Sequence, residues 1–341
     1  MLRCTTPLAL AAAVMATPAV AQDIRQTDND WFTAGQARIQ AELAKQTNTS
    51  TAKNVILMIS DGNGVGTNYA TRLFMGQQEG GLGDDFVLPF EEFPNLALAK
   101  TYNVNAQTPD SAGTGTAMMS GVKTKAGVIG ANENVSRGDC STLPGNELTG
   151  ISEILHGMGK STGFVSTARV THATPASAYA KTADRNFEDD SLLPEGCTEQ
   201  SDIATQLIDA MESGLISVAM GGGYRHFVPS GEELPVGGTG RRGDGINLVE
   251  RATELGAYHA YNDETFANAP VDGTPLLGLF EGSHMMYEAD RFDDAVFDPH
   301  EELAVVATRR LCGVFRERRV GECPGVSWVP VVVGEPVVEP V

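Results

Sequence analysis

The chain has 341 residues, a formal net charge of −20, 38 glycines and only 6% aromatic residues. This length accommodates one large domain or two ordinary ones with a substantial buried core. The acidic balance excludes nucleic-acid binding, which needs a basic face, and any phosphate site must draw local positive charge from arginine or metal.

The first 21 residues have the pattern of a secretory signal peptide. Arg3 provides a positive n-region, residues 8–14 form an apolar run, and Ala19 to Ala21 (AVA) is a small-x-small cleavage site. The apolar run is too short to span a bilayer. We therefore expect cleavage after Ala21, no transmembrane span, and a mature protein that is periplasmic or extracellular.

Two cysteines lie in the body of the chain, Cys140 and Cys197. A disulfide between them is expected only if the compartment is oxidising, and the sequence alone leaves free thiols equally open.

Strand-like and helix-like segments alternate along the chain after a polar, helical lead-in over residues 22–50. The expected strands cover residues 54–60, 95–104, 163–167, 216–220 and 257–261. One helix is expected to begin near residue 108, and three more are expected over residues 151–159, 200–211 and 246–255. This alternation predicts an α/β fold with a largely parallel central sheet flanked by helices on both faces.

Asp61 directly follows the apolar run of residues 54–60 (NVILMIS). It is therefore expected at the carboxyl end of a buried parallel strand, where α/β sheets gather their ligands. The glycines of the following GNGVG segment do not match the G-x-G-x-x-G pattern of dinucleotide-binding loops. They favour instead a close approach of the backbone to a metal or a phosphate.

Ser111 lies in the segment Gln107 to Gly121, QTPDSAGTGTAMMSG. Thr108 and Pro109 are helix-start signals, so Ser111 is expected in the first turn of a helix. Free backbone N–H groups and the helix dipole favour an anion there, which makes the serine a candidate nucleophile for a phosphate-like substrate. The alternative is that Asp110 or Ser111 only caps the helix.

A third polar cluster, with His172, Thr174 and Arg185, follows the strand expected at residues 163–167. Taken singly, His172 suits a loop histidine and Arg185 a surface ion pair. Together with Asp61 and the serine they meet the needs of phosphoryl transfer, because carboxylate and hydroxyl oxygens bind Mg²⁺ and an arginine fork holds phosphate oxygens.

Several segments resemble, in the same order, those of the alkaline phosphatase family. NVILMISDGNGVG is similar to the family's first metal-binding strand, TPDSAGTGTAMMSGVKTKAGVIG to its phosphoserine signature, and STARVTHATPASAYAKTADR to its magnesium and arginine segment. DIATQL, VAMGGGYRHF and GLFEGSHMMYEADR are also similar. The resemblance covers roughly residues 50–299.

The resemblance implies hydrolysis of phosphate monoesters by two in-line displacements, with Zn²⁺ and Mg²⁺ as cofactors. Asp61 would bridge one zinc and the magnesium, and Ser111 would bind that zinc and become phosphoserine. Asp110 would position Arg185, which would clamp the phosphate. Members of the family are often dimers, so a homodimer is compatible with the resemblance.

The resemblance also assigns further ligands. Thr174 would bind magnesium, with His172 beside that site. Phe280 (through its carbonyl), Glu281 and Asp298 resemble part of a Ca²⁺ site in the animal-type branch.

The chain departs from the family pattern in its last part. The family's remaining zinc ligands come from a segment like EGGRIDHAHH, an Asp-His pair and a late histidine, and no histidine follows residue 300 here. Residues 301–341 hold five arginines and twelve valines but no lysine or aspartate. We therefore expect a signal peptide over 1–21, an incomplete domain over 22–300, and an out-of-frame, truncated or divergent tail.

Three functions remain open on these grounds. The first is alkaline phosphatase activity, and the second is a catalytically impaired member that keeps a partial Mg²⁺ and phosphate site. The third, a phosphodiesterase or sulfatase-type hydrolase, is disfavoured by the Asp-Ser-Ala signature.

Overall fold

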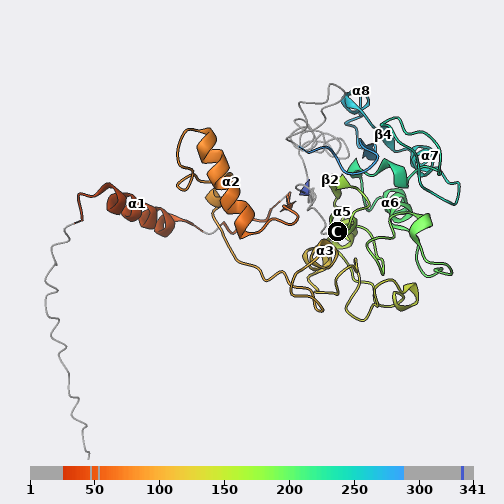
Figure 1. Ribbon diagram of the computed structural model, residues 1–341, viewed down its shortest axis with the longest axis horizontal. Coiled ribbons are helices and arrows are strands. Elements are labelled where there is room, and N and C mark those ends of the chain that lie inside the picture. Colours follow the sequence, from red (N-terminus) through yellow and green to blue (C-terminus); the bar gives the residue numbers. More distant parts are fainter. Residues whose placement is uncertain (1–25, 47, 53, 288–331, 334–341) are drawn as a thin grey trace, which may run out of the picture. The chain divides into compact units, whose positions relative to one another are not determined.

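The computed structural model describes residues 26–46, 48–52, 54–287 and 332–333 (Figure 1). The chain divides into two units, residues 1–50 and residues 51–341. The expected signal peptide, Asp298 and nearly all of the expected tail lie outside the described residues. No helix within the described ranges is both long and apolar enough to cross a membrane.

In the first unit, helix α1 (Asp30–Ala44) occupies most of the expected helical lead-in. The Asn29 side chain caps it by accepting hydrogen bonds from the backbone N–H groups of Trp31 and Phe32, at 3.0 and 3.3 Å. None of its residues is buried.

The second unit alternates helices and strands. Its helices are α2 (Val65–Gln78), α3 (Ser111–Ser120), α4 (Ile151–Gly157), α5 (Ala173–Ala176), α6 (Ile203–Glu212), α7 (Leu248–Glu254) and α8 (Asp263–Ala267). Its strands are β1 (Met58–Ile59), β2 (Gly163–Arg169), β3 (Val218–Gly222), β4 (Tyr258–Ala260), β5 (Leu276–Leu279) and β6 (Val332–Val333). Short 3₁₀ turns cover Pro89–Glu92, Cys140–Thr142, Asp190–Leu192 and Tyr224–His226.

Four of the strands form a parallel sheet in the order β2-β3-β5-β4. Gly163 pairs with Val218, Val218 with Leu276, and Leu276 with Tyr258, so the strands are aligned at their amino ends. β1 and β6 form a separate parallel pair. The predicted α/β class with a parallel sheet flanked by helices is confirmed.

The apolar face of α6 forms part of the hydrophobic core. Ile203, Leu207 and Ile208 are fully buried, and Met211 is nearly so, as the helical spacing predicts. Each such side chain stabilises the fold by about 1.5–3 kcal/mol through burial. Asp202 caps the helix by accepting a 2.9 Å hydrogen bond from the Thr205 N–H.

Two strand expectations are wrong in detail, and one strand was missed. No strand forms over residues 95–104, where Leu96 and Leu98 are almost fully exposed. An apolar run becomes a strand only when a neighbouring strand accepts its backbone hydrogen bonds, and no described strand does so there. The strand expected at 54–60 narrows to β1, and β5 was not among the expected strands.

Helix α4 also differs from its expected inward face. The spacing of Ile151, Ile154, Leu155 and Met158 predicts one buried stripe, but Ile154 and Met158 are exposed. Ser152 is buried instead. The helix ends at Gly157, so Met158 lies beyond its last turn and does not follow its periodicity.

Large exposed apolar side chains concentrate between residues 55 and 104. They include Val55, Ile56, Met58, Val65, Tyr69, Phe74, Leu82, Phe93, Leu96 and Leu98. Surfaces of this kind are normally covered by other parts of a protein or by a partner.

Candidate functional site

Ser111 is the first residue of α3, and Asp110 is the residue that caps this helix. The Asp110 backbone is extended (φ −110°, ψ 162°), and its carboxylate Oδ1 accepts a 3.1 Å hydrogen bond from the Gly113 N–H. The helix ends at Gly121, which adopts a left-handed φ of 75° that favours glycine. The serine is therefore held in the first turn, where the sequence places it.

The Asp110 carboxylate also reaches the arginine that lies 75 residues further along the chain. Its Oδ2 accepts a 2.9 Å hydrogen bond from the Gly127 N–H and lies 3.4 Å from Arg185 Nη1. Arg185 is itself fixed, because its backbone N–H donates to the Gly127 carbonyl at 2.8 Å. The Asp110 side chain therefore both caps α3 and contacts Arg185.

His172 lies on the other side of the same guanidinium. Arg185 Nη2 donates to His172 Nε2 at 2.7 Å. Burial and the positive charges of Arg185 and Arg169 lower the pKa of His172 to about 3, so the imidazole is neutral at physiological pH. An imidazole that accepts at Nε2 carries its proton on Nδ1, and this buried atom has no partner among the described residues.

Asp61 and Thr174 meet at the start of α5. The Thr174 hydroxyl donates a 2.8 Å hydrogen bond to Asp61 Oδ2, across 113 residues of sequence. Thr174 is almost fully buried. The structure thus joins these residues in a second pair, beside the trio formed by Asp110, Arg185 and His172.

Helices α3 and α5 pack closely, which brings the serine-bearing helix against the threonine-bearing one. Helix α5 also packs against β2, next to which it is labelled in Figure 1. A Cβ on Gly115 would lie 2.9 Å from Ser177 Oγ, so a larger residue there would have to displace that side chain.

The residues fit part of a magnesium site. A carboxylate and a hydroxyl within hydrogen-bond distance are hard oxygen donors of the kind Mg²⁺ binds while keeping several waters. The unpartnered His172 Nδ1–H suits a hydrogen bond to such a water rather than direct coordination.

The described residues do not fit a zinc site. Among them, no group of three or more His, Cys, Asp or Glu side chains could hold a metal ion. Zinc usually takes four ligands, or three and a water, rich in imidazole or thiolate. Asp61 and Ser111 fall short of that set.

The residues expected at a calcium site are only partly described. Phe280 is buried at the end of β5, and its backbone N–H donates to the Gly221 carbonyl at 2.9 Å. The Glu281 carbonyl accepts hydrogen bonds from the N–H groups of Gly223 and Tyr224. The surroundings of Phe280 and Glu281 are therefore described, but Asp298 lies outside the described ranges.

Sequence reasoning missed a buried charged network behind His172. Glu188 accepts two 2.8 Å hydrogen bonds from the Arg169 guanidinium and one of 2.6 Å from Thr171 Oγ1. Although burial opposes ionisation, these bonds and nearby positive charge lower the pKa of Glu188 to about 2.

The network extends through two more histidines. His226 donates through Nδ1 to Asp189 Oδ2 at 2.6 Å, and its Nε2 lies 3.4 Å from Glu188 Oε2. Arg169 Nη1 donates to His284 Nε2 at 2.6 Å, and the His284 ring packs edge-on against His172, with centroids 5.2 Å apart. The position of Arg169 at the end of a strand was the one available sequence signal.

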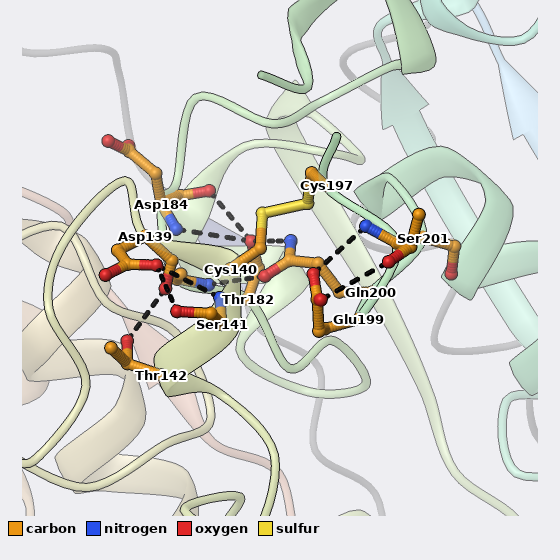
Figure 2. The surroundings of a disulfide bond; sticks show 12 residues. Asp139, Cys140, Ser141, Thr142, Thr182, Asp184, Cys197, Glu199, Gln200 and Ser201 are labelled. Atoms are coloured by element: carbon orange, nitrogen blue, oxygen red, sulfur yellow. Dashed lines mark hydrogen bonds between the residues drawn. A yellow bond between two sulfur atoms is a disulfide. The ribbon is translucent and has the colours of Figure 1, made fainter. Parts of the chain in front are cut away.

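A disulfide joins Cys140 and Cys197, the pair considered from the sequence, with Cα atoms 5.6 Å apart (Figure 2). Gln200 binds the chain beside it, accepting from the Ala183 N–H and donating to Thr182 Oγ1. The bond encloses the segment that carries His172, Thr174 and Arg185. By loop-entropy arguments, closing a loop of this length stabilises the fold by about 4 kcal/mol.

These features define a class of protein: an α/β fold with a serine at a helix start and an arginine held by the preceding aspartate. A sequence model of the family described as alkaline phosphatase matches residues 52–313. The chain belongs to the alkaline phosphatase family.

Individual alkaline phosphatases are also similar to this chain in sequence. The chain is 36% identical over 325 residues to the tissue-nonspecific alkaline phosphatase of Mus musculus, covering 90% of this chain and 62% of the relative. It is 40% identical over 296 residues to the Gallus gallus isozyme, covering 82% of this chain and 56% of the relative. The chain therefore spans about 60% of the length of such relatives.

Solved structures show the same fold. The alkaline phosphatase of Thermus thermophilus superimposes with a TM-score of 0.63 at 24% identity, covering 86% of this chain and 52% of that one. The enzyme of the Antarctic bacterium TAB5 gives 0.58 at 20% identity, covering 83% of this chain and 65% of that one.

Proposed function

We propose that this chain hydrolyses phosphate monoesters through a phosphoserine formed on Ser111. The observation that carries the proposal is the contact between Asp110 and Arg185, which lies beside the serine although 75 residues separate the two. A guanidinium held in this way presents its remaining N–H groups to two phosphate oxygens.

In this proposal Ser111 Oγ attacks phosphorus in line with the ester oxygen. The serine loses its proton to solvent, the ester P–O bond breaks, and the leaving oxygen takes up a proton from solvent to become the alcohol. Water later attacks phosphorus and breaks the serine O–P bond, which releases phosphate and returns a proton to the serine. Arg185 holds the phosphoryl oxygens, and Asp110 keeps the arginine in place. The free N–H groups at the start of α3 favour the ionised serine oxygen and the phosphoryl charge.

We propose Mg²⁺ at Asp61 and Thr174, with His172 beside it. Bound there, the ion supplies positive charge that stabilises negative oxygen atoms of the reacting groups. A variant of the TAB5 alkaline phosphatase has been solved with Mg bound in its M3 site. Family membership alone motivates Zn²⁺ at Asp61 and Ser111, a ligand set that the described residues do not complete. Ca²⁺ near Phe280, Glu281 and Asp298 is a further part of the proposal, also on family grounds.

The second candidate is a member that binds Mg²⁺ and phosphate without turnover. The absence of a zinc-type ligand cluster among the described residues favours it. Both candidates share the domain arrangement and the periplasmic or extracellular location proposed from the signal-like residues 1–21. A homodimer is proposed on family grounds. As regards location, one relative is a membrane-bound alkaline phosphatase of Bombyx mori.

Hydrolysis of p-nitrophenyl phosphate at alkaline pH, with Mg²⁺ and Zn²⁺ added, separates the two candidates. Ser111→Ala should abolish metal-dependent activity. Ser120→Ala is the matched control, because its hydroxyl bonds only within and just after the same helix. Absence of turnover in the unmodified chain, with phosphate binding retained, would favour the second candidate.

A further inference from the structure

Asn103 is a buried side chain that contacts the Asp110 carboxylate from the loop before α3. Only 3% of Asn103 is exposed, and its Nδ2 donates a 2.8 Å hydrogen bond to Asp110 Oδ1. Its backbone N–H donates to the Ala106 carbonyl at 3.0 Å, and the Ala106 N–H returns a bond of 3.3 Å. The amide is therefore presented by a closed, fixed turn.

The two oxygens of Asp110 serve different partners. Oδ1 accepts from Asn103 and from the Gly113 N–H, whereas Oδ2 accepts from the Gly127 N–H and faces Arg185. A carboxylate rotates easily about its last torsion, which has only a broad two-fold preference. The donors on Oδ1, together with the Gly127 N–H on Oδ2, therefore fix which way Oδ2 points.

Helix α3 is built to admit this amide. A Cβ on Gly113 would lie 2.5 Å from Asn103 Oδ1, so any other residue would displace the asparagine. Glycine inside a helix costs about 1 kcal/mol relative to alanine. At that cost, Gly113 lets the Asn103 amide pack against the helix and hold the Asp110 carboxylate in one orientation.

The chemistry of the amide suits the role. Asparagine donates a hydrogen bond without adding charge, so Asp110 keeps its full negative charge for the arginine. An aspartate at this position would instead face the Asp110 carboxylate with a second negative charge.

We propose that Asn103 is a positioning residue for phosphate binding: it fixes the Asp110 carboxylate, which in turn holds Arg185 in the orientation that grips the phosphoryl oxygens. This inference rests on the proposed function and adds to it a residue outside the serine, arginine and metal positions.

The test compares Asn103→Ala with Asn105→Ala. Asn105 is a matched control from the same loop, because its side chain accepts a 2.9 Å hydrogen bond from the Ala126 N–H and is not bonded to Asp110. Inorganic phosphate is titrated calorimetrically in the presence of Mg²⁺. Asn103→Ala should raise the Kd about tenfold, as expected for loss of a hydrogen bond to a charged group. Asn105→Ala should leave the Kd within twofold.

A double-mutant cycle separates positioning from general destabilisation. If Asn103 acts through Arg185, then Asn103→Ala should change the Kd far less in an Arg185→Ala background. Equal effects in both backgrounds, or equal losses in Asn103→Ala and Asn105→Ala, would overturn the inference.

A readout without ligand distinguishes this inference from the proposed function. The NMR signal of the Arg185 side-chain Nε–H in the free protein should shift in Asn103→Ala and stay in place in Asn105→Ala. That shift supports the positioning of Arg185 by Asn103 even if the protein neither binds nor hydrolyses phosphate. An unchanged signal in Asn103→Ala overturns it even in an active enzyme.

Discussion

Thr174 donates a 2.8 Å hydrogen bond to Asp61 although 113 residues separate the two in sequence. We propose that Mg²⁺ binds at this pair. Thr174→Val keeps the shape and removes the hydroxyl oxygen, so calorimetric titration should show Mg²⁺ affinity about tenfold weaker. Thr116→Val is the control, because this buried hydroxyl bonds to the Val128 carbonyl and the Gly130 N–H instead. Equal loss in both variants would contradict a role for Thr174 in metal binding.

The proposed phosphate grip depends on the shape of the Arg185 side chain as well as its charge. Arg185→Lys keeps the charge but loses the fork that contacts Asp110 and His172 together. The Kd for inorganic phosphate should rise at least tenfold. Arg251→Lys, at an exposed pair with Asp209 and Glu212, controls for the substitution itself and should leave phosphate binding unchanged.

Glu188 should contribute strongly to stability because it is buried and paired with Arg169. Glu188→Gln leaves the arginine without its counter-charge and should lower the free energy of unfolding by about 3–5 kcal/mol. The matched variant Glu153→Gln breaks the more exposed pair with Lys181 and should cost less than about 1 kcal/mol. Urea denaturation at pH 7 measures both, and equal small effects would show that the buried pair is not specially stabilising.

The same carboxylate predicts a pH dependence. Its folded pKa of about 2 lies below the ordinary value of 4.5 for glutamate. Its stabilisation is therefore fully present above pH 4.5 and is lost as pH falls toward 2. The difference in unfolding free energy between the parent protein and Glu188→Gln should narrow across that window.

The stability of the protein should also depend on pH through His259, which lies in β4. Burial lowers its pKa to about 4, and its Nε2 is buried without a partner among the described residues. Below pH 6.5 the unfolded chain binds a proton that the folded protein does not, so stability falls between pH 6.5 and about 4. His259→Phe should reduce that slope by at most about 1.4 kcal/mol per pH unit. An unchanged slope in urea melts at several pH values would contradict the assignment.

The fold was largely predictable where apolar runs are continuous. Strands β2 and β3 follow from GFVST and ISVAM, because parallel strands buried on both faces need no polar alternation. The strand prediction over residues 95–104 was wrong because an apolar run alone does not make a strand. Whether Leu96 and Leu98 enter a sheet depends on a partner strand, which local sequence does not specify.

The candidate site divides in the same way. Ser111 at a helix start follows from local capping chemistry. Its association with Asp61, Asp110, Thr174 and Arg185 was inferred from polar clusters at expected strand ends, and the family resemblance then assigned each residue its role. The ion pair of Glu188 with Arg169 depends on a tertiary contact, and nothing in the acidic run EDD distinguishes Glu188 from its neighbours. Buried pairs of this kind become visible only once the chain is folded.

Formation of phosphoserine on Ser111 tests the central claim most directly. The protein is mixed with p-nitrophenyl phosphate and Mg²⁺ and Zn²⁺, quenched in acid within seconds, digested and examined by mass spectrometry. We predict one added phosphoryl group on the peptide that contains Ser111, and none in Ser111→Ala. A phosphoryl group on another residue, or p-nitrophenol release that persists in Ser111→Ala, would contradict the account.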